Sequence, residues 1–342
     1  MRTLISLLRI CGKLVQKIAQ NEFNKLLQRA HETQRFLYAK DTSKNIKSHF
    51  RTYLIYCTYF QRTAVPADAD TLVGFAEFMS FTVGYQHIKH LFCSIRLLHD
   101  IYNADCLQND FRVDAPLQSL KRKLAKTPLQ VLPIEPDILT AMALFLDLNK
   151  PADQAFWASL LVAFFCLFRK KSLVPKSQRE FNPRTELSRR KIATYPEENL
   201  AFVYANFSKT NQFCEREVVL PLIGNPNSIL NPVTALNNLF VNNPANLDDP
   251  AFTYFENGKK MCITYNSFTV RLKKILLQAG YNPKLYSGHS LRRGGACWLY
   301  KQGGDHLMIR YAGDWASDIF VRYVWIDINQ RLKAQMLMSS NC

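Results

Sequence analysis

The spacing of apolar residues changes at one basic, proline-rich stretch of the chain, residues 121–136 (KRKLAKTPLQVLPIEP). Between residues 40 and 126, apolar residues recur at helical intervals and no alternating strand pattern occurs. After the stretch, helical spacing is interrupted by a short period-two segment and then returns. A chain of 342 residues is long enough for two domains. The pattern therefore predicts an all-helical unit, an exposed linker and a larger mixed unit.

The expected elements follow from these patterns. We expect a basic N-terminal helical extension (1–39), a helical unit (40–126), a linker (127–136) and a mixed unit (137–342). In the mixed unit, helices are expected near 137–147, 152–168, 232–241, 264–279, 290–302 and 305–312, and another from about 317. Two strands, 200–205 and 217–221, are expected to form a hairpin. The predicted fold class is mainly α with a small antiparallel β-sheet.

The charge of the chain restricts its partners. It has 44 Lys and Arg against 27 Asp and Glu, a formal net charge of +17. This balance rules out acidic disordered and collagen-like chains and disfavours an enzyme of small metabolites. A polyanion is the favoured partner, because cationic side chains that neutralise phosphates release counterions. The excess gathers at the N-terminus and around 169–191 and 259–293, although charge runs are usually only solvated surfaces.

Cysteine spacing and hydropathy bear on the cellular compartment. The nine cysteines form no C-x-x-C pair, which disfavours a zinc ribbon or redox motif and favours reduced thiols in an intracellular protein. The longest apolar run, 158–168, is shorter than the roughly 20 residues of a membrane-spanning helix and predicts a buried core helix. The basic, amphipathic N-terminus is interpreted as a basic-faced helix, with a mitochondrial presequence as the alternative.

The segment GHSLRRGGACWLY, residues 288–300, carries the most specific chemical signal. His289 and Arg292 are three residues apart and are expected on one face of a first helical turn. A helix N-terminus with an imidazole and a guanidinium favours a phosphate. A capping histidine followed by surface arginines is the alternative.

Four further residues stand in a characteristic order around this segment. Arg169 lies in LFRKKSLVP and Lys209 in FSKTNQF, the expected hairpin connection. Downstream, GDWASDIFVRYVW contains Trp315 and, eight residues later, Tyr323. Taken singly, Tyr323 could be a core aromatic and Lys209 a solvated loop lysine.

The order Arg, Lys, His-x-x-Arg, Trp, Tyr resembles the tyrosine recombinase (phage integrase) superfamily over about 137–335. The 40–126 unit resembles that family's helical core-binding domain, which makes the mixed unit the α+β catalytic domain. The amino-acid sequences of these motifs are most similar to those of recombinases of Ngaro and DIRS-type eukaryotic retroelements. The resemblance implies a DNA breaking and rejoining enzyme, a site-specific recombinase or integrase encoded by a mobile element.

The resemblance also implies roles for the reacting groups. Tyr323 is the expected nucleophile, which attacks a backbone phosphodiester to give a 3′-phosphotyrosyl bond and a free 5′-hydroxyl. Arg169 and Arg292 are expected to bind the non-bridging oxygens. Because two guanidiniums supply the positive charge, no metal and no cofactor is expected.

The remaining catalytic residues are expected to move or position protons. Lys209 would protonate the 5′-oxygen, and His289 would assist proton transfer near the nucleophile. Trp315 stands where many family members have His, and its indole can only donate, so it is expected to position and pack. Ser172 replaces an acidic residue that many members carry three positions after the first arginine, which leaves the support of Arg169 open.

Other basic residues are expected to contact DNA. They are Lys44, Lys47, Lys89, Lys171 and Arg293, with a merely solvated helix surface as the alternative.

Double-stranded DNA is the expected partner. Recombination joins two duplexes, so the resemblance implies that four protomers assemble in the complex that pairs them. Outside this complex the protein is expected to be a monomer or a dimer. A tail helix at 327–338 would pack in a neighbour or in cis. An inactive, domesticated DNA-binding protein and a type IB topoisomerase-like enzyme are the alternatives. A nuclear location follows from a DNA substrate in a eukaryote.

Overall fold

The computed structural model describes most of the chain. The described residues are 23–30, 32–33, 37–125, 131–205, 211, 216–315, 317, 321, 332 and 335–336. They form two units, Met1–Pro128 and Leu129–Cys342, each of which is described by itself. Within the described residues, no helix is long and apolar enough to span a bilayer. The helix expected from residue 317 and the tail helix lie, apart from isolated positions, outside the described residues.

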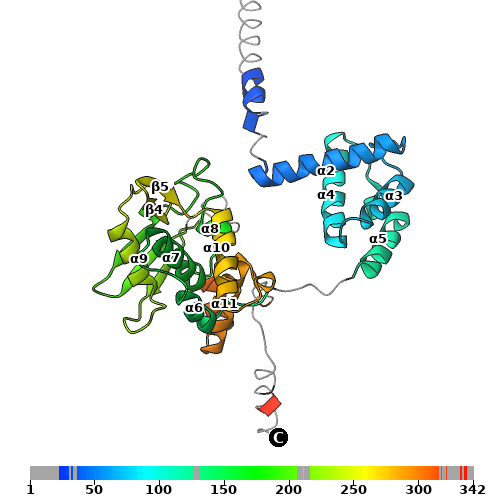
Figure 1. The fold of residues 1–342 in the computed structure, drawn as a ribbon. Helices are drawn as coiled ribbons and strands as arrows, with labels where there is room; N and C mark the ends of the chain where they lie inside the picture. Colours follow the sequence, from blue (N-terminus) through cyan, green and yellow to red (C-terminus); the bar gives the residue numbers. More distant parts are fainter. Residues whose placement is uncertain are drawn as a thin grey trace, which may run out of the picture. The chain divides into compact units, whose positions relative to one another are not determined.

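The described part of the first unit is helical, as its apolar spacing predicts (Figure 1). Its elements are α2 (Lys40–Tyr59), α3 (Ala69–Ser80), α4 (Tyr85–Ile101), the short η1 (Leu107–Asn109) and α5 (Phe111–Lys123). Asp68 caps α3 by accepting a hydrogen bond from the backbone of Thr71 at 2.7 Å. Tyr53 and Phe75 pack edge-to-face in the core with ring centroids 5.1 Å apart.

The second unit combines helices with two small antiparallel sheets (Figure 1). Its helices are α6 (Pro136–Ala143), α7 (Pro151–Phe165), α8 (Lys170–Leu173), α9 (Pro232–Asn242), α10 (Tyr265–Gln278), α11 (Gly288–Lys301) and α12 (His306–Ala312), with short η2 (Arg189–Lys191) and η3 (Pro283–Leu285). Its strands are β1 (Ile192–Tyr195), β2 (Leu200–Tyr204), β3 (Val219–Ile223), β4 (Thr253–Glu256) and β5 (Lys259–Cys262). The fold class is mainly α with small antiparallel sheets, as predicted.

The sheets contain more strands than the sequence indicates. The predicted hairpin is present as β2 and β3, with Val203 opposite Leu220, but β1 adds a third strand with Ile192 opposite Val203. The β4–β5 hairpin lies between the helices predicted at 232–241 and 264–279, where no element was expected. Each missed strand has only four residues, and the sequence KKMC of β5 buries one of them, so period-two spacing gives no signal.

Helix α7 forms the centre of the second unit and contacts α9, α11 and β4 (Figure 1). Its residues are buried almost without interruption, which confirms the core helix expected within 158–168. The helix ends at Phe165, and Leu167 takes a left-handed backbone conformation with φ of 49°. This turn redirects the chain, so that Arg169 leaves the core at the end of α7.

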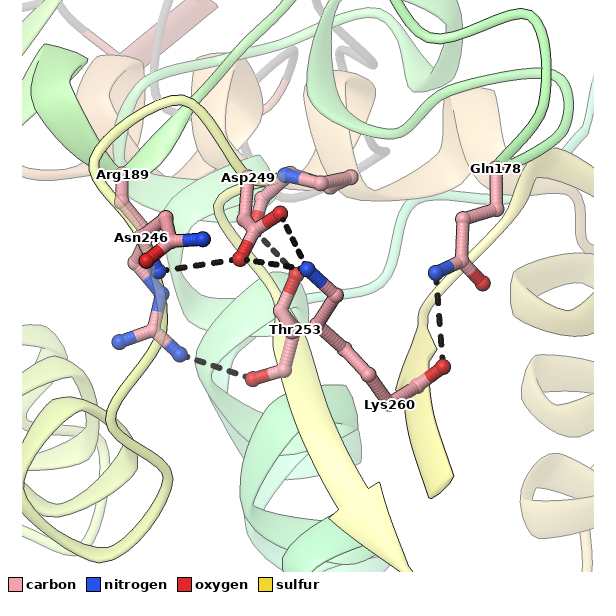
Figure 2. A network of polar contacts seen from close by, with 7 residues as sticks. Gln178, Arg189, Asn246, Asp249, Thr253 and Lys260 are labelled. Atoms are coloured by element: carbon pink, nitrogen blue, oxygen red, sulfur yellow. Dashed lines mark hydrogen bonds and ion pairs between the residues drawn. The ribbon is translucent and has the colours of Figure 1, made fainter.

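A buried arginine fixes the β4–β5 hairpin. The Arg189 side chain donates to the carbonyl of Thr253 at 2.8 Å, and its backbone N–H donates to the carbonyl of Asp249 at 3.0 Å (Figure 2). The Asp249 carboxylate in turn accepts from Lys260 of β5 at 2.8 Å. Burial lowers the pKa of Arg189 to about 10, so the side chain stays charged at neutral pH. These bonds tie the hairpin to the segment that leads into β1.

The expected exposed linker is wrong for residues 131–136, which pack on α11. The backbone N–H of Ile134 donates to the carbonyl of Ser290 at 2.9 Å, and the Ile134 side chain is fully buried. Gly294 faces the Ile134 carbonyl so closely that a Cβ atom would overlap it. A valine, a leucine and an isoleucine make this stretch apolar enough to be covered, despite its prolines and its basic neighbours.

We predict that Gly294→Ala lowers the free energy of unfolding of the second unit by about 2 kcal/mol, because the methyl group overpacks against backbone. All four tryptophans lie in this unit, so tryptophan fluorescence during urea unfolding measures the change. Gln302→Ala at the exposed end of α11 is the control, with a change within about 0.5 kcal/mol. Equal midpoints for the two variants would contradict the close packing.

Candidate active site

Arg169 and Arg292 line one hollow in the second unit, although 123 positions separate them in the sequence. Arg169 is the N-cap of α8 and is partly exposed. Arg292 projects from the first turns of α11. We call this place the arginine hollow; Ser172, Glu186 and Asp314 also line it. Two guanidiniums thus converge from different elements, an arrangement suited to a bidentate anion.

Arg292 is buried, with 2% of its surface exposed, and is held from three sides. It donates hydrogen bonds to the backbone carbonyls of Leu167 and, at 2.8 Å, of Gly313. Its guanidinium carbon lies 3.9 Å from the centre of the Trp315 ring, a cation–π contact. The bonds and the ring restrict the guanidinium to one plane.

The Gly313–Trp315 turn is built for this contact. A side chain at position 313 would overlap the Trp315 ring, so glycine is required there. Asp314 takes a left-handed conformation with φ of 48°, which reverses the chain. Arg310 donates to the carbonyl of Trp315 at 3.2 Å. The indole is 3% exposed and packs rather than reaching solvent, in agreement with the positioning role expected from its chemistry.

His289 lies at the start of α11. Ser287 and Ser290 close the helix N-terminus with reciprocal hydrogen bonds of a capping box. The pKa of His289 is lowered, first by partial desolvation and then by the positive charges of Arg292, Arg169 and Lys170. The imidazole is therefore neutral at pH 7 and can accept a proton. The electrostatic effect also shows that the predicted His289, Arg169 and Arg292 lie in one neighbourhood.

Lys170 lies near the same residues, although the sequence did not predict it as part of the site. Its ammonium lies 3.5 Å from the centre of the Tyr265 ring and donates to Thr269 at 2.5 Å, both on α10. Its stem packs against Gly288, where a Cβ atom would be too close. The sequence offers no signal for it, because Lys170 and Lys171 are adjacent and alike.

Glu186 supplies a carboxylate to the arginine hollow, where Ser172 supplies only a hydroxyl. Its side chain accepts a hydrogen bond from the backbone of Asn182 at 2.7 Å. Burial raises the pKa of Glu186, against the opposing effects of that hydrogen bond, Lys171 and Lys191. No spacing rule connects Glu186 with Arg169, so sequence reasoning could not find it.

Two predicted catalytic residues, Lys209 and Tyr323, lie outside the described residues. Their roles stay predictions from the sequence. Lys209 falls in the connection between β2 and β3, and Tyr323 follows Trp315 by eight residues.

The other predicted DNA contacts divide by exposure. Lys44 and Lys47 on α2 and Lys89 on α4 are exposed, as is Lys171 beside Arg169. Arg293 does not fit the expectation: it is 6% exposed and donates to the carbonyl of Val131 at 3.2 Å. Its side chain secures the 131–136 segment on α11 instead of facing phosphate.

The described residues contain no group of three His, Cys, Asp or Glu side chains placed to hold a metal ion. The six cysteines described, Cys57, Cys93, Cys106, Cys166, Cys262 and Cys297, are free thiols.

Comparisons with known proteins relate this arrangement to known folds. No protein-family model and no curated protein sequence matches the chain. Among solved structures, the Tn1549 transposon integrase in complex with transposon right end DNA matches with a TM-score of 0.57 at 12% identity, covering 91% of this chain and 98% of that chain. The chain has the tyrosine recombinase fold. The XerH site-specific recombinase bound to a palindromic difH substrate, a post-cleavage complex, matches with a TM-score of 0.53 at 14% identity, covering 85% and 77%.

The likeness extends over both units of this chain and is one of backbone, since few residues are identical. It agrees with the fold that the order of motifs implied. The tyrosine recombinase fold accounts for the helical first unit and for the small sheets beside α7 and α9 in the second.

We predict that Arg169→Gln raises the pKa of His289, because a nearby cation is removed. The measurement is an NMR titration of the His289 ring carbon. Lys171→Gln is the matched control: it removes an exposed cation from the same turn and should change the pKa of His289 less than Arg169→Gln does. If both variants shift the titration equally, or if His289 in the unaltered chain titrates above 6.5, the assigned electrostatics are wrong.

Proposed function

We propose that the chain is a site-specific DNA recombinase that cleaves and rejoins strands through a 3′-phosphotyrosyl intermediate. The observation that carries the proposal is the convergence of Arg169 and Arg292 in one hollow beside the neutral imidazole of His289. The fold, the net charge of +17 and the order of the motifs support it.

Charge complementarity defines what the hollow does. A scissile phosphate gains negative charge on its non-bridging oxygens as it becomes pentacoordinate. Arg169 and Arg292 stabilise this charge, and Arg292 can do so without reorganisation because Trp315 and two carbonyls already hold it.

Proton transfer accompanies the exchange of oxygens. The Tyr323 oxygen forms the new phosphorus–oxygen bond and loses its proton, and the bond to the 5′-oxygen breaks. His289, neutral at pH 7, accepts the proton near the nucleophile, and Lys209 gives one to the 5′-oxygen. The phosphodiester energy is conserved in the phosphotyrosine, so a second 5′-hydroxyl reverses the step without ATP.

The finer assignment concerns the biological setting. We propose that the chain is a mobile-element enzyme of the Ngaro or DIRS type that acts in a eukaryotic nucleus. The amino-acid sequences of the motifs HSLRRGGA and GDWASDIFVRY support this proposal. The Tn1549 transposon integrase among the structural neighbours agrees with a transposable element. Synapsis of two duplexes would bring four protomers together.

We predict that the chain forms a covalent adduct with a nicked suicide substrate, and that Tyr323→Phe abolishes the adduct, because the phenolic oxygen is the attacking atom. Denaturing gel electrophoresis of labelled DNA measures the product. Tyr311→Phe, at a tyrosine 77% exposed on α12, is the control and should keep the adduct.

An adduct that persists in Tyr323→Phe would remove Tyr323 as the nucleophile. An absence of adduct from the unaltered chain on every DNA tested would favour binding alone. Exchange of flanks between two sites, as opposed to relaxation of a one-site plasmid, distinguishes a recombinase from a topoisomerase.

We predict that the double variant Lys44→Gln, Lys47→Gln weakens DNA binding and lowers the slope of log K against log salt concentration by about 1.8, since each phosphate contact contributes about 0.9. Fluorescence anisotropy at several salt concentrations measures the slope. Lys123→Gln is the control, because Lys123 is exposed but paired with Glu77 at 2.8 Å. An unchanged slope in the double variant would show that these lysines are only solvated.

A further inference from the structure

One ion pair joins the arginine hollow to the edge of the three-stranded sheet. The Arg216 guanidinium lies 2.8 Å from the Asp314 carboxylate. Arg216 stands just before β3, and the next-but-one residue, Val218, accepts a backbone hydrogen bond from Ala205 at 2.8 Å. Asp314 lines the hollow together with Arg169 and Arg292. The pair therefore bridges two segments almost a hundred residues apart in sequence.

The position of Asp314 makes the pair relevant to chemistry. Its two neighbours in sequence are the groups that hold Arg292: Gly313 accepts the guanidinium hydrogen bond, and the Trp315 ring lies against it. Asp314 itself occupies a left-handed conformation, which aspartate and asparagine adopt more readily than other residues with a Cβ atom. The Arg216 contact holds its carboxylate from the sheet side.

The other end of the pair is also fixed. The buried side-chain amide of Asn211 donates to the backbone carbonyl of Arg216 at 2.7 Å. Arg216 is 48% exposed and Asp314 16% exposed, so solvent screens the pair from the arginine side and limits its contribution to the stability of the fold. Its effect is then expected on local geometry more than on unfolding.

We propose that Arg216 and Asp314 are positioning residues for the phosphate clamp: the ion pair fixes the Gly313–Trp315 turn, and through it the plane of the Arg292 guanidinium. The inference rests on the proposed function, since it assigns the pair to the DNA cleavage step. Neither residue needs to touch DNA. A displaced turn would leave Arg292 misaligned with the non-bridging oxygens, and misalignment by a fraction of an ångström is costly to a rate.

The test compares two DNA substrates in single-turnover cleavage. One has a natural scissile phosphate, and the other has a methylphosphonate there, in which a neutral methyl group replaces one charged oxygen. Because the methylphosphonate develops less negative charge, it depends less on an aligned arginine. We expect Arg216→Ala to slow cleavage of the natural phosphate about tenfold and cleavage of the methylphosphonate less than about twofold.

Two further variants keep the test independent of folding. Asp314→Asn retains a residue tolerant of the left-handed conformation and removes the charge, so it should show the same selective loss. The double variant Arg216→Ala, Asp314→Asn should lose no more rate than either single variant, because each single change already removes the same ion pair. Arg190→Ala breaks a matched exposed pair with Asp248, at 3.1 Å and away from the hollow, and should leave both rates unchanged.

An equal loss on both substrates, an unchanged rate in Arg216→Ala, or additive losses in the double variant would overturn the proposal. Failure of the unaltered chain to cleave the natural substrate contradicts the proposed function instead, so the two failures are distinguishable.

Discussion

The buried guanidinium of Arg292 is the interaction on which the second unit depends. Burying a charge is unfavourable unless it is hydrogen-bonded, and the two terminal nitrogens of Arg292 donate to the carbonyls of Leu167 and Gly313. These residues follow α7 and α12, while Arg292 belongs to α11. The Arg292 side chain thus joins three parts of the chain. The hydrogen bonds that fix its charge also hold α11 to the segments that follow α7 and α12. The guanidinium of Arg292 therefore both stabilises the packing of this unit and lines the arginine hollow.

The left-handed turn at Leu167 explains how an apolar helix delivers a charged residue. Helix α7 is buried along nearly its whole length and could not carry an exposed arginine on its own surface. The reversal after Phe165 turns the Leu167 carbonyl toward Arg292 and brings Arg169 out of the core. The two guanidiniums therefore line one hollow because a turn of three residues, 166–168, lies between the core helix and Arg169.

Sequence patterns predicted the parts of this protein in which residues recur at the regular spacing of a helix or a strand. Helical spacing located α7 and α11, and the i, i+3 relation placed His289 and Arg292 in one neighbourhood, as the lowered pKa of His289 shows. The short strands β4 and β5 could not be found, because four residues with one buried position have no measurable period.

Residues that act through tertiary contacts were also beyond the sequence. Lys170 differs from Lys171 only in the α10 side chains it meets. The 131–136 segment, although rich in proline, is covered because Ile134 fits against a glycine of α11. Both outcomes depend on partners remote in the chain, which no local pattern records.

The glycine pair of α11 has an evolutionary consequence. Gly294 faces the Ile134 carbonyl and Gly295 faces the Phe164 carbonyl, so the helix is in backbone contact on two sides directly after Arg292. Neither residue has a functional group, yet any side chain there would shift the helix that carries the arginine. In a survey of tolerated substitutions these positions should be as restricted as reacting residues. Strong restriction at a site is therefore a poor measure of which atoms perform chemistry.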